Sequence, residues 1–300
     1  MKLGFIGLGV MGRPMALNLM KHGHEMGVYA RRPESAAPLV DAGATRYASP
    51  ADLAAQADVI FTMVTTSSDV EAIALGADGI AAAARRGSVL VDMETINPAI
   101  ARSVAARLEE KGIDMLDAPV SGGPAGAQQA TLSIMVGGKA AVFERVKPLF
   151  ECLGKTIRHM GDHGAGQVTK ACNQLALLVA AQGAAEALAL AHANGLDPAQ
   201  VREVLLSGVA ASRVLDLFGK RMVERDFTAG IEARLYHKDL DIVLTLAHGL
   251  GQALPAGAIV MQHINALMGR GEGSEDLSAL IKVIEAMSLP NAEREMRNAE

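Results

Sequence analysis

The sequence contains no tryptophan, and aromatic residues make up only 3% of its 300 positions. Its formal net charge at pH 7 is −5, so basic residues are not in excess. Proteins that bind nucleic acids present a basic surface, often with aromatic side chains on which bases stack. Because both features are missing, we expect no nucleic-acid partner and favour a small molecule.

Cysteine is equally scarce, with only Cys152 and Cys172 in the chain. They form no CxxC pair and no tight cluster with histidine, which disfavours both a structural disulfide and a zinc site. His22 and His24 form an HxH pattern on an expected turn, where solvated loop histidines are a simpler interpretation than a metal site. We expect no metal and a reducing compartment.

Patterns typical of a signal peptide or a membrane span are also missing. Met1 and Lys2 lead directly into the apolar LGFIGLG, without the regions that define a signal peptide. The longest apolar run, about 175–191, is rich in alanine and is interrupted by Gln182 and Glu186. It is more typical of a buried helix in a globular domain than of a membrane span. We therefore expect a cytoplasmic protein with no membrane partner.

Half of the residues are hydrophobic, which is enough for two globular domains. In the first half, the apolar runs KLGFI, MGVYA, DVIFTMV, SVLVDM, IDMLDAP and TLSIMVGG alternate with amphipathic segments such as 97–111. This alternation predicts a mostly parallel sheet with covering helices. After GDHGAG the strand pattern stops, and Ala, Leu and Met recur at helical spacing.

The predicted fold class is therefore α/β, with an N-terminal Rossmann-type domain followed by an all-helical C-terminal domain. The change of pattern places the first domain at 1–162. It places a helical substrate and oligomerisation domain at 163–290 and a polar tail at 291–300.

The motif GLGVMG follows the first apolar run and opens an expected helix over 11–22. In this context Gly7 allows a tight turn, Gly9 lets a pyrophosphate approach the backbone, and Gly12 allows close packing of helix and strand. A glycine-rich structural turn is the alternative, but the position after the first strand favours dinucleotide binding. The other motif residues expected at the cofactor are Leu8, Val10 and Met11.

The second expected strand leads into Arg31 and Arg32, where an NAD-preferring site would carry an acidic residue for the ribose. A guanidinium matches a 2′-phosphate in charge and in geometry. We therefore expect NADP(H) as the preferred cofactor, with NAD(H) possible. The alternative is that both arginines are ordinary solvated charges of a loop.

Another glycine-rich stretch, DAPVSGG, places Ser121, Gly122 and Gly123 just past an expected strand end. Consecutive unhindered backbone amides and a hydroxyl form a small concave anion site that suits a carboxylate. Taken alone, this stretch is equally well explained as a structural turn.

GLGVMG, DAPVSGG, GAGQVTKACNQ and YHKDL occur in this order over most of the chain. In this combination the sequence resembles the β-hydroxyacid dehydrogenase family. The resemblance covers about residues 1–288. It implies that Arg31 reads the adenosine ribose, that Thr95 and Lys238 lie close to the cofactor, and that Lys170 is the catalytic residue.

The same resemblance assigns the substrate carboxylate to Ser121, Gly122 and Gly123. It also matches Asn173 and Gln174 to an amide pair that follows the catalytic lysine. Many relatives carry asparagine at the second of these positions. The Asn-Gln pair and the segment 207–217 are more similar to tartronate semialdehyde reductases than to 3-hydroxyisobutyrate dehydrogenases.

Two departures from the family pattern lie beside the expected nicotinamide pocket. Val64, Thr65 and Thr66 stand where members commonly carry Pro-Asn or Pro-Asp, and Glu94 replaces a common serine. Neither removes a catalytic group, but both weaken the assignment of the substrate. The segment TINP also has a structural interpretation as a helix start with Asn97 as its cap.

On a helix, Lys170, Asn173 and Gln174 would share one face because they are spaced i, i+3 and i+4. An exposed lysine at a helix end is the alternative, but the surrounding helix is apolar on most sides, which predicts burial on nearly all faces. A buried lysine must be paired, neutralised or used. Near a substrate oxygen it can act as a general acid in reduction and as a base in oxidation.

These observations and the resemblance predict an NADPH-dependent reductase of a short carboxylated aldehyde, with tartronate semialdehyde as the favoured substrate and glycerate as its product. Within the class, enzymes of 3-hydroxyisobutyrate, succinic semialdehyde or glyoxylate are alternatives. Imine reductases share the architecture but usually replace the lysine. A non-catalytic dinucleotide-binding protein is the alternative from another class. Apolar helices in excess of what one helical domain can bury predict a homodimer or homotetramer.

Overall fold

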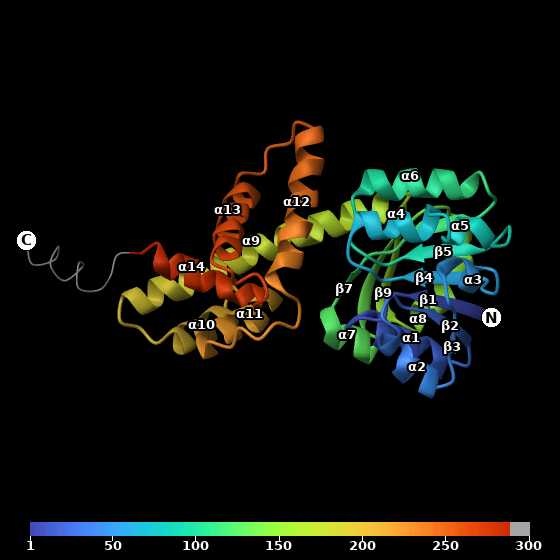
Figure 1. Ribbon diagram of the computed structural model, residues 1–300. Coiled ribbons are helices and arrows are strands. Elements are labelled where there is room, and N and C mark those ends of the chain that lie inside the picture. The colour runs from blue at the N-terminus through green and yellow to red at the C-terminus, as the bar shows by residue number, and fades with distance from the viewer. Residues whose placement is uncertain (289–300) are drawn as a thin grey trace, which may run out of the picture. The chain divides into compact units, whose positions relative to one another are not determined.

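The computed structural model describes residues 1–288, and the predicted tail at 291–300 lies outside them. Contacts divide the chain into two compact units, Met1–Lys170 and a second unit that begins at Ala171. The division falls inside one long helix, whereas the change of sequence pattern placed the domain boundary at 162. Figure 1 shows the α/β unit and the helical unit.

The first unit is built on one sheet with the strand order β3-β2-β1-β4-β5-β6-β8-β7, and β9 pairs with β8. The strands from β3 to β6 run parallel, β8 is antiparallel to β6 and to β7, and β9 is parallel to β8. The predicted Rossmann-type α/β fold is thus confirmed. The strands are β1 (Lys2–Ile6), β2 (Glu25–Tyr29), β3 (Thr45–Arg46), β4 (Val59–Thr62), β5 (Val89–Asp92), β6 (Asp114–Asp117), β7 (Val120–Ser121), β8 (Leu132–Gly137) and β9 (Gly154–Gly161).

Helices cover both faces of this sheet, with α1, α2 and α7 opposite α4, α5 and α6 (Figure 1). The helices of this unit are α1 (Gly12–Lys21), the 3₁₀ helix η1 (Pro33–Ala36), α2 (Ala37–Asp41), α3 (Pro50–Ala54), α4 (Ser67–Leu75), α5 (Ile80–Ala83), α6 (Pro98–Glu109), α7 (Gly123–Gln129), α8 (Ala140–Glu151) and the beginning of α9 (Ala165–Ala193).

Alternation along the strands creates a separate core on each face of the sheet. On one face, Phe5 and Phe61 pack with residues of α1, α2 and α8. On the other, Ile60 and Leu90 pack with residues of α3 to α6. Because both faces are covered, the central strands β4 and β5 are buried throughout, which explains their nearly continuous apolar sequences.

Three strands were not predicted. β3 and β7 have only two residues each, too few for any pattern, and they lie toward the two ends of the sheet. β9 is longer, but its sequence GKTIRHMG alternates exposed and partly buried residues and is rich in charge. It is positioned by its pairing with β8 rather than by an apolar sequence of its own.

The second unit is helical within the described residues. It contains the rest of α9, α10 (Pro198–Ser207), α11 (Arg213–Glu224), α12 (Ala233–Gly249), α13 (Pro255–Gly269), the 3₁₀ helix η2 (Leu277–Ala279) and α14 (Leu280–Ala286). Pro198 and Pro255 occupy the first position of their helices, where the missing backbone N–H costs little. Leu178, Leu188 and Leu240 are fully buried at the centre of its core.

Helix α9 is the only helix among the described residues that is long and apolar enough to cross a membrane. Core helices of globular proteins pass the same test. Only 39% of its most apolar window is buried, and Leu190 is 66% exposed. Burial on nearly all faces, which the apolar sequence predicted, is therefore wrong for the single chain.

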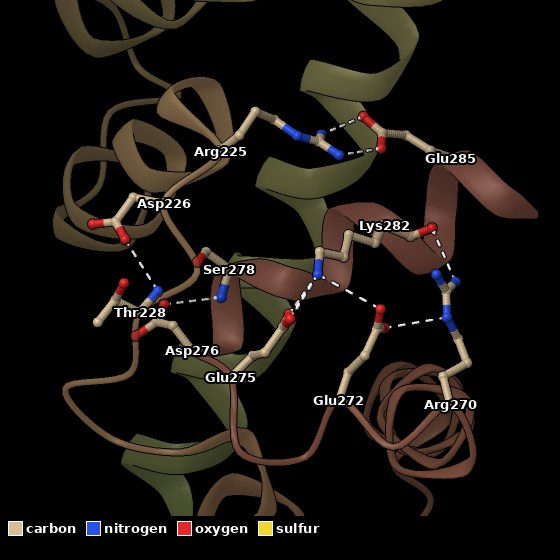
Figure 2. A network of polar contacts seen from close by, with 10 residues as sticks. All are labelled: Arg225, Asp226, Thr228, Arg270, Glu272, Glu275, Asp276, Ser278, Lys282 and Glu285. Carbon is tan, nitrogen blue, oxygen red and sulfur yellow. Dashed lines mark hydrogen bonds and ion pairs between the residues drawn. The ribbon is translucent and has the colours of Figure 1, made fainter.

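A network of charged side chains ties the end of the helical unit to its neighbours (Figure 2). Lys282 Nζ lies 2.6 Å from Glu275 Oε2 and 3.6 Å from Glu272 Oε1. Arg225 donates two hydrogen bonds to Glu285, of 2.8 and 3.0 Å. Bidentate geometry and linked charges make such a network more stabilising than isolated surface pairs.

Candidate active site

The loop between β1 and α1 has the geometry of a dinucleotide-binding turn. Gly7 has φ +96°, and a side chain there would collide with the Met63 carbonyl oxygen. A Cβ on Gly12 would collide with the Gly7 carbonyl oxygen and lie 2.9 Å from the Phe5 ring, so helix and strand pack closely. A Cβ on Gly9 would meet no atom of residues 1–288 within 4 Å. The loop is therefore open at Gly9, where a phosphate would approach the backbone.

The other residues predicted at the cofactor differ in exposure. Leu8 is buried in the core, whereas Val10 is 67% exposed. Met11 packs partly against the core below the loop. After β4, Val64 is partly buried and Thr65 is exposed. Val10 and Thr65 are thus accessible to a ligand, whereas Leu8 supports the loop from inside.

Arg31 follows β2 and extends into solvent. Its side chain is 79% exposed, and its Nη1 lies 3.5 Å from Asp69 Oδ1. Asp69 belongs to the first turn of α4, whose N-cap Thr66 accepts a hydrogen bond from the Asp69 backbone N–H. An ion pair this exposed is weak, so Arg31 retains the freedom to bind another anion.

Ser121 lies within β7 rather than just past a strand end. It pairs with Ser133 of β8, Gly122 follows as the N-cap of α7, and Gly123 is the first residue of that helix. Gly122 and Gly123 have φ values of +136° and +62°, a region that disfavours other residues. These glycines are therefore required by the backbone of the turn, whatever the turn binds.

Thr95 is held in a turn between β5 and α6. The predicted helix start is confirmed, because Asn97 Oδ1 accepts a hydrogen bond from the Ala99 N–H at 2.8 Å and Pro98 occupies the first position. On either side of Thr95, the side-chain amide of Gln167 binds the backbone. Its Nε2 donates to the Glu94 carbonyl oxygen at 2.7 Å, and its Oε1 accepts from the Ile96 N–H at 3.0 Å.

Asp117, at the end of β6, holds the start of α9. Its Oδ1 accepts from the Gly164 N–H at 2.7 Å, and its Oδ2 accepts from the Gln167 N–H at 3.0 Å. Burial raises the pKa of Asp117 above its usual range, and the two amides oppose that shift. Gly137 and Gly166 leave the necessary space, since a Cβ on either would lie within 3 Å of the carboxylate.

Asp92, at the end of β5, is a second buried acid. Its Oδ1 accepts a hydrogen bond from the Thr62 hydroxyl at 2.8 Å, and its Oδ2 has no hydrogen-bond partner among the described residues. Burial raises its pKa to about 8, and the negative charges of Glu94 and Asp117 add to this shift. Asp92 is therefore mostly a neutral acid at pH 7. Neither Gln167, Asp117 nor Asp92 was singled out from the sequence.

Lys170 lies on α9 one turn after Gln167 and is only 7% exposed, as the sequence predicted. Gln167 lies three positions before Lys170 on the same face of α9, and its side chain binds the Thr95 turn. Lys170 is the last residue of the first unit.

In the helical unit, the other predicted site residues form a chain of polar contacts through Asp239. Asn173 Nδ2 donates to Gln174 Oε1 at 2.8 Å, and Gln174 Nε2 donates to Asp239 Oδ2 at 2.5 Å. The other Asp239 oxygen lies 3.3 Å from Lys238 Nζ. Asp239 is 8% exposed. Asp239 belongs to the YHKDL motif, but the family resemblance gave a role only to Lys238 of that motif.

Comparisons with known proteins agree with this arrangement. The family model of the NAD binding domain of 6-phosphogluconate dehydrogenase matches residues 2–161. The model described as NAD-binding of NADP-dependent 3-hydroxyisobutyrate dehydrogenase matches residues 164–284. The chain belongs to the 3-hydroxyisobutyrate dehydrogenase-like β-hydroxyacid dehydrogenase family.

Individual relatives of this β-hydroxyacid dehydrogenase differ in substrate. It is 43% identical to the 2-hydroxy-3-oxopropionate reductase of Escherichia coli, over 96% of this chain and 98% of that one. It is 40% identical to a 3-hydroxyisobutyrate dehydrogenase of Pseudomonas aeruginosa, over 86% and 89% of the two chains. The solved 3-hydroxyisobutyrate dehydrogenase of Mycobacterium tuberculosis, with L-serine, has 32% identity and a TM-score of 0.87 over 94% and 98%.

Membership identifies the chain as an NAD(P)-dependent hydroxyacid dehydrogenase with a nicotinamide dinucleotide cofactor. The residues present fit that cofactor, because the turn is open at Gly9 and closely packed at Gly7 and Gly12. Among the described residues, no group of three or more His, Cys, Asp or Glu side chains would hold a metal ion.

Proposed function

We propose that this enzyme reduces tartronate semialdehyde (2-hydroxy-3-oxopropionate) to glycerate with NADPH. The observation that carries the proposal is the burial of Lys170, at 7% exposure, within the segment GAGQVTKACNQ. A lysine buried in a mostly apolar helix is costly unless its charge is compensated or its proton is used. The Asn173-Gln174 pair and the similarity to the Escherichia coli reductase favour tartronate semialdehyde among the family's substrates.

Lys170 supplies the proton in this proposal. When bound, the nicotinamide supplies the hydride chemistry of the reaction. Lys170 Nζ, within hydrogen-bond reach of the aldehyde oxygen, donates a proton to that oxygen and so produces the hydroxyl group of glycerate. In the oxidative direction the neutral amine takes the hydroxyl proton back.

The substrate carboxylate binds at Ser121, Gly122 and Gly123. The hydroxyl of Ser121 and the unhindered backbone N–H groups of the two glycines are donors suited to a carboxylate. Gly122 is exposed and Ser121 and Gly123 are only partly buried, which supports this role because a ligand can reach the turn. Asn173 and Gln174 orient the substrate and remain predictions from the family resemblance.

Gly7, Gly9 and Gly12, together with Leu8, Val10 and Met11, form the loop that holds the pyrophosphate in this proposal. Arg31 binds the 2′-phosphate of NADPH. Its 79% exposure supports this assignment, because the guanidinium is available to an anion. Val64, Thr65, Thr95 and Lys238 complete the predicted cofactor contacts.

We further propose a homodimer or homotetramer in the cytoplasm. The support is a set of exposed apolar side chains in the helical unit, among them Val204, Val209, Leu250 and Ile259. Light scattering coupled to size-exclusion chromatography measures the assembly directly. A monomer at micromolar concentration would contradict this part of the proposal.

Initial rates with a panel of aldehydes test the substrate. The panel contains glyoxylate, tartronate semialdehyde, methylmalonate semialdehyde and succinic semialdehyde, each with NADPH and with NADH. We expect the highest kcat/KM for tartronate semialdehyde with NADPH. A higher value for methylmalonate semialdehyde would instead assign the enzyme to 3-hydroxyisobutyrate. No turnover with any member would favour a non-catalytic dinucleotide-binding protein.

A further inference from the structure

Gln167 joins two segments that lie far apart in the sequence. Its amide bridges the backbone on both sides of Thr95, with partners at Glu94 and Ile96 that are 73 and 71 positions away. The side chain is 1% exposed, so water does not compete for these bonds.

The orientation of this amide is fixed by chemistry. The Glu94 carbonyl oxygen can only accept a hydrogen bond, and the Ile96 N–H can only donate one. Nε2 must therefore face Glu94 and Oε1 must face Ile96. A hydrocarbon side chain makes neither bond, and a carboxylate makes only the bond from Ile96.

The backbone of Gln167 is fixed as well. Its N–H donates to Asp117 Oδ2 at 3.0 Å, and Asp117 also binds the Gly164 N–H. One residue thus connects the end of β6, the start of α9 and the turn after β5. Starting α9 at Ala165 does not by itself require that these hydrogen bonds be so completely buried.

Lys170 follows Gln167 by three positions, on the same face of α9. The Gln167 bridge therefore sets the position of the Thr95 turn relative to the helical turn that carries Lys170. Catalysis depends steeply on such placement, because a displacement of about 1 Å can cost roughly 10²-fold in rate.

We propose that Gln167 is a positioning residue for the dehydrogenase reaction, which fixes the Thr95 turn against the segment of α9 that carries Lys170. The inference rests on the proposed role of Lys170 as the proton donor. It assigns Gln167 no contact with substrate or cofactor.

The first experiment compares Gln167→Met with Gln182→Met in the full-length enzyme. Gln182 is a matched control, because it is also a buried amide of α9 and its Nε2 donates to Glu186 Oε1, at 2.7 Å and on the same helix. We expect kcat to fall roughly 10-fold or more in Gln167→Met, with KM changed much less. Gln182→Met should keep kcat within about 2-fold. An equal and small effect of both variants would overturn the proposal.

The second experiment uses Gln167→Glu, which keeps the shape of the side chain. As a carboxylate it cannot donate to the Glu94 carbonyl oxygen, whereas the protonated acid can. Burial and the neighbouring Asp117 raise the pKa of such a carboxyl, so it takes up a proton at accessible pH. The ratio of kcat in Gln167→Glu to kcat in the wild type should therefore rise as pH falls.

Taking this ratio cancels any pH dependence that the two proteins share. The same ratio for Gln167→Met should stay flat with pH. A flat ratio for both variants would show that the amide's hydrogen bonds do not position the site. Because the glutamate variant is judged by the slope of its ratio, the test holds even if Gln167→Met fails to fold.

A double-variant cycle with Lys170→Ala separates this proposal from the proposed function. The substrate is whichever aldehyde the wild type reduces fastest. If Gln167 acts through Lys170, adding Gln167→Met to Lys170→Ala should lower kcat by less than about 2-fold. Full multiplication of the two losses would overturn the positioning role. An unchanged kcat in Lys170→Ala alone would instead reject the proposed proton donor.

Discussion

The Gln174 side chain donates to the buried Asp239 carboxylate, with 2.5 Å between Nε2 and Oδ2. Asparagine at position 174 would be shorter by one methylene group. In this chain the extra length lets α9 reach α12, and it leaves Gln174 Oε1 to accept from Asn173 Nδ2. Asp239 thereby fixes the amide pair, and its Oδ1 lies 3.3 Å from Lys238 Nζ.

Shortening Gln174 should therefore destabilise the protein. We expect Gln174→Asn to lower the free energy of unfolding by about 1–3 kcal/mol, the usual loss for a buried hydrogen bond to a charged group. Urea denaturation measures this change. Gln182→Asn, on the same helix, is the control. Its partner Glu186 is exposed, so losing that hydrogen bond should lower the free energy of unfolding by less. Equal losses in both variants would show that the bond to Asp239 has no special weight.

The raised pKa of Asp92 predicts that the stability of the protein depends on pH. Its pKa is about 8 in the folded protein against an ordinary value of 3.8. Between these values the folded state holds a proton that the unfolded state has released, so stability falls as pH rises through this window. The slope contributed by Asp92 is at most about 1.4 kcal/mol per pH unit, and it disappears above the folded pKa.

Asp92→Asn should remove this slope, because asparagine is neutral at every pH and keeps an oxygen for the Thr62 hydroxyl. Unfolding curves at pH 5 to 9 should show the variant gaining stability relative to the wild type as pH rises. The difference between the two proteins isolates the contribution of Asp92, including its electrostatic coupling to Asp117. Parallel curves would mean that Asp92 is already ionised in the folded protein at pH 7.

Arg31 should determine the cofactor preference. With its guanidinium free to leave Asp69, Arg31→Ala should raise the KM for NADPH about 10-fold or more, since a charge-assisted bidentate contact is lost. The KM for NADH should change less than about 2-fold, because NADH has no 2′-phosphate. Arg32→Ala, also exposed, is the matched control. Equal losses with both cofactors would assign Arg31 to the fold instead.

What the sequence predicted well depends on local backbone requirements. GLGVMG identified its turn because Gly7 and Gly12 lie against nearby backbone or the adjoining strand, and Gly9 leaves the turn open. Asn97 and Pro98 identified a helix start for the same reason. The alternation of buried strands and amphipathic helices was likewise predictable, because the apolar pattern of each segment indicates which of its residues are buried.

What the sequence did not show depends on distant partners. Gln167 and Asp239 lie within the motifs GAGQVTKACNQ and YHKDL, but the motifs did not show their roles, because both side chains bind groups 65 or more positions away. β9 was missed because its order comes from pairing with β8, not from apolar residues. Leu190 shows the opposite error, since its apolar neighbourhood predicted burial and the single chain leaves it 66% exposed.

Lys170 is the decisive residue for the proposed mechanism. If it is the proton donor, Lys170→Ala should lower kcat by roughly 10²-fold or more, the usual scale of general acid–base catalysis. Lys170→Arg should not restore the rate, because a guanidinium holds its proton too tightly and has a different shape. Lys155→Ala, at an exposed lysine of β9, should keep the wild-type rate.

These rates have meaning only for folded variants that bind the cofactor. NADPH fluorescence titration should give wild-type values for all three, since no contact of the Gly7 to Gly12 loop is changed, and thermal unfolding should show that each variant is folded at the assay temperature. The loss should then appear in kcat and kcat/KM together, as expected for a group that acts in the transition state. A Lys170→Ala enzyme that folds, binds NADPH and keeps most of its kcat would leave Lys170 a structural charge and remove it from the mechanism.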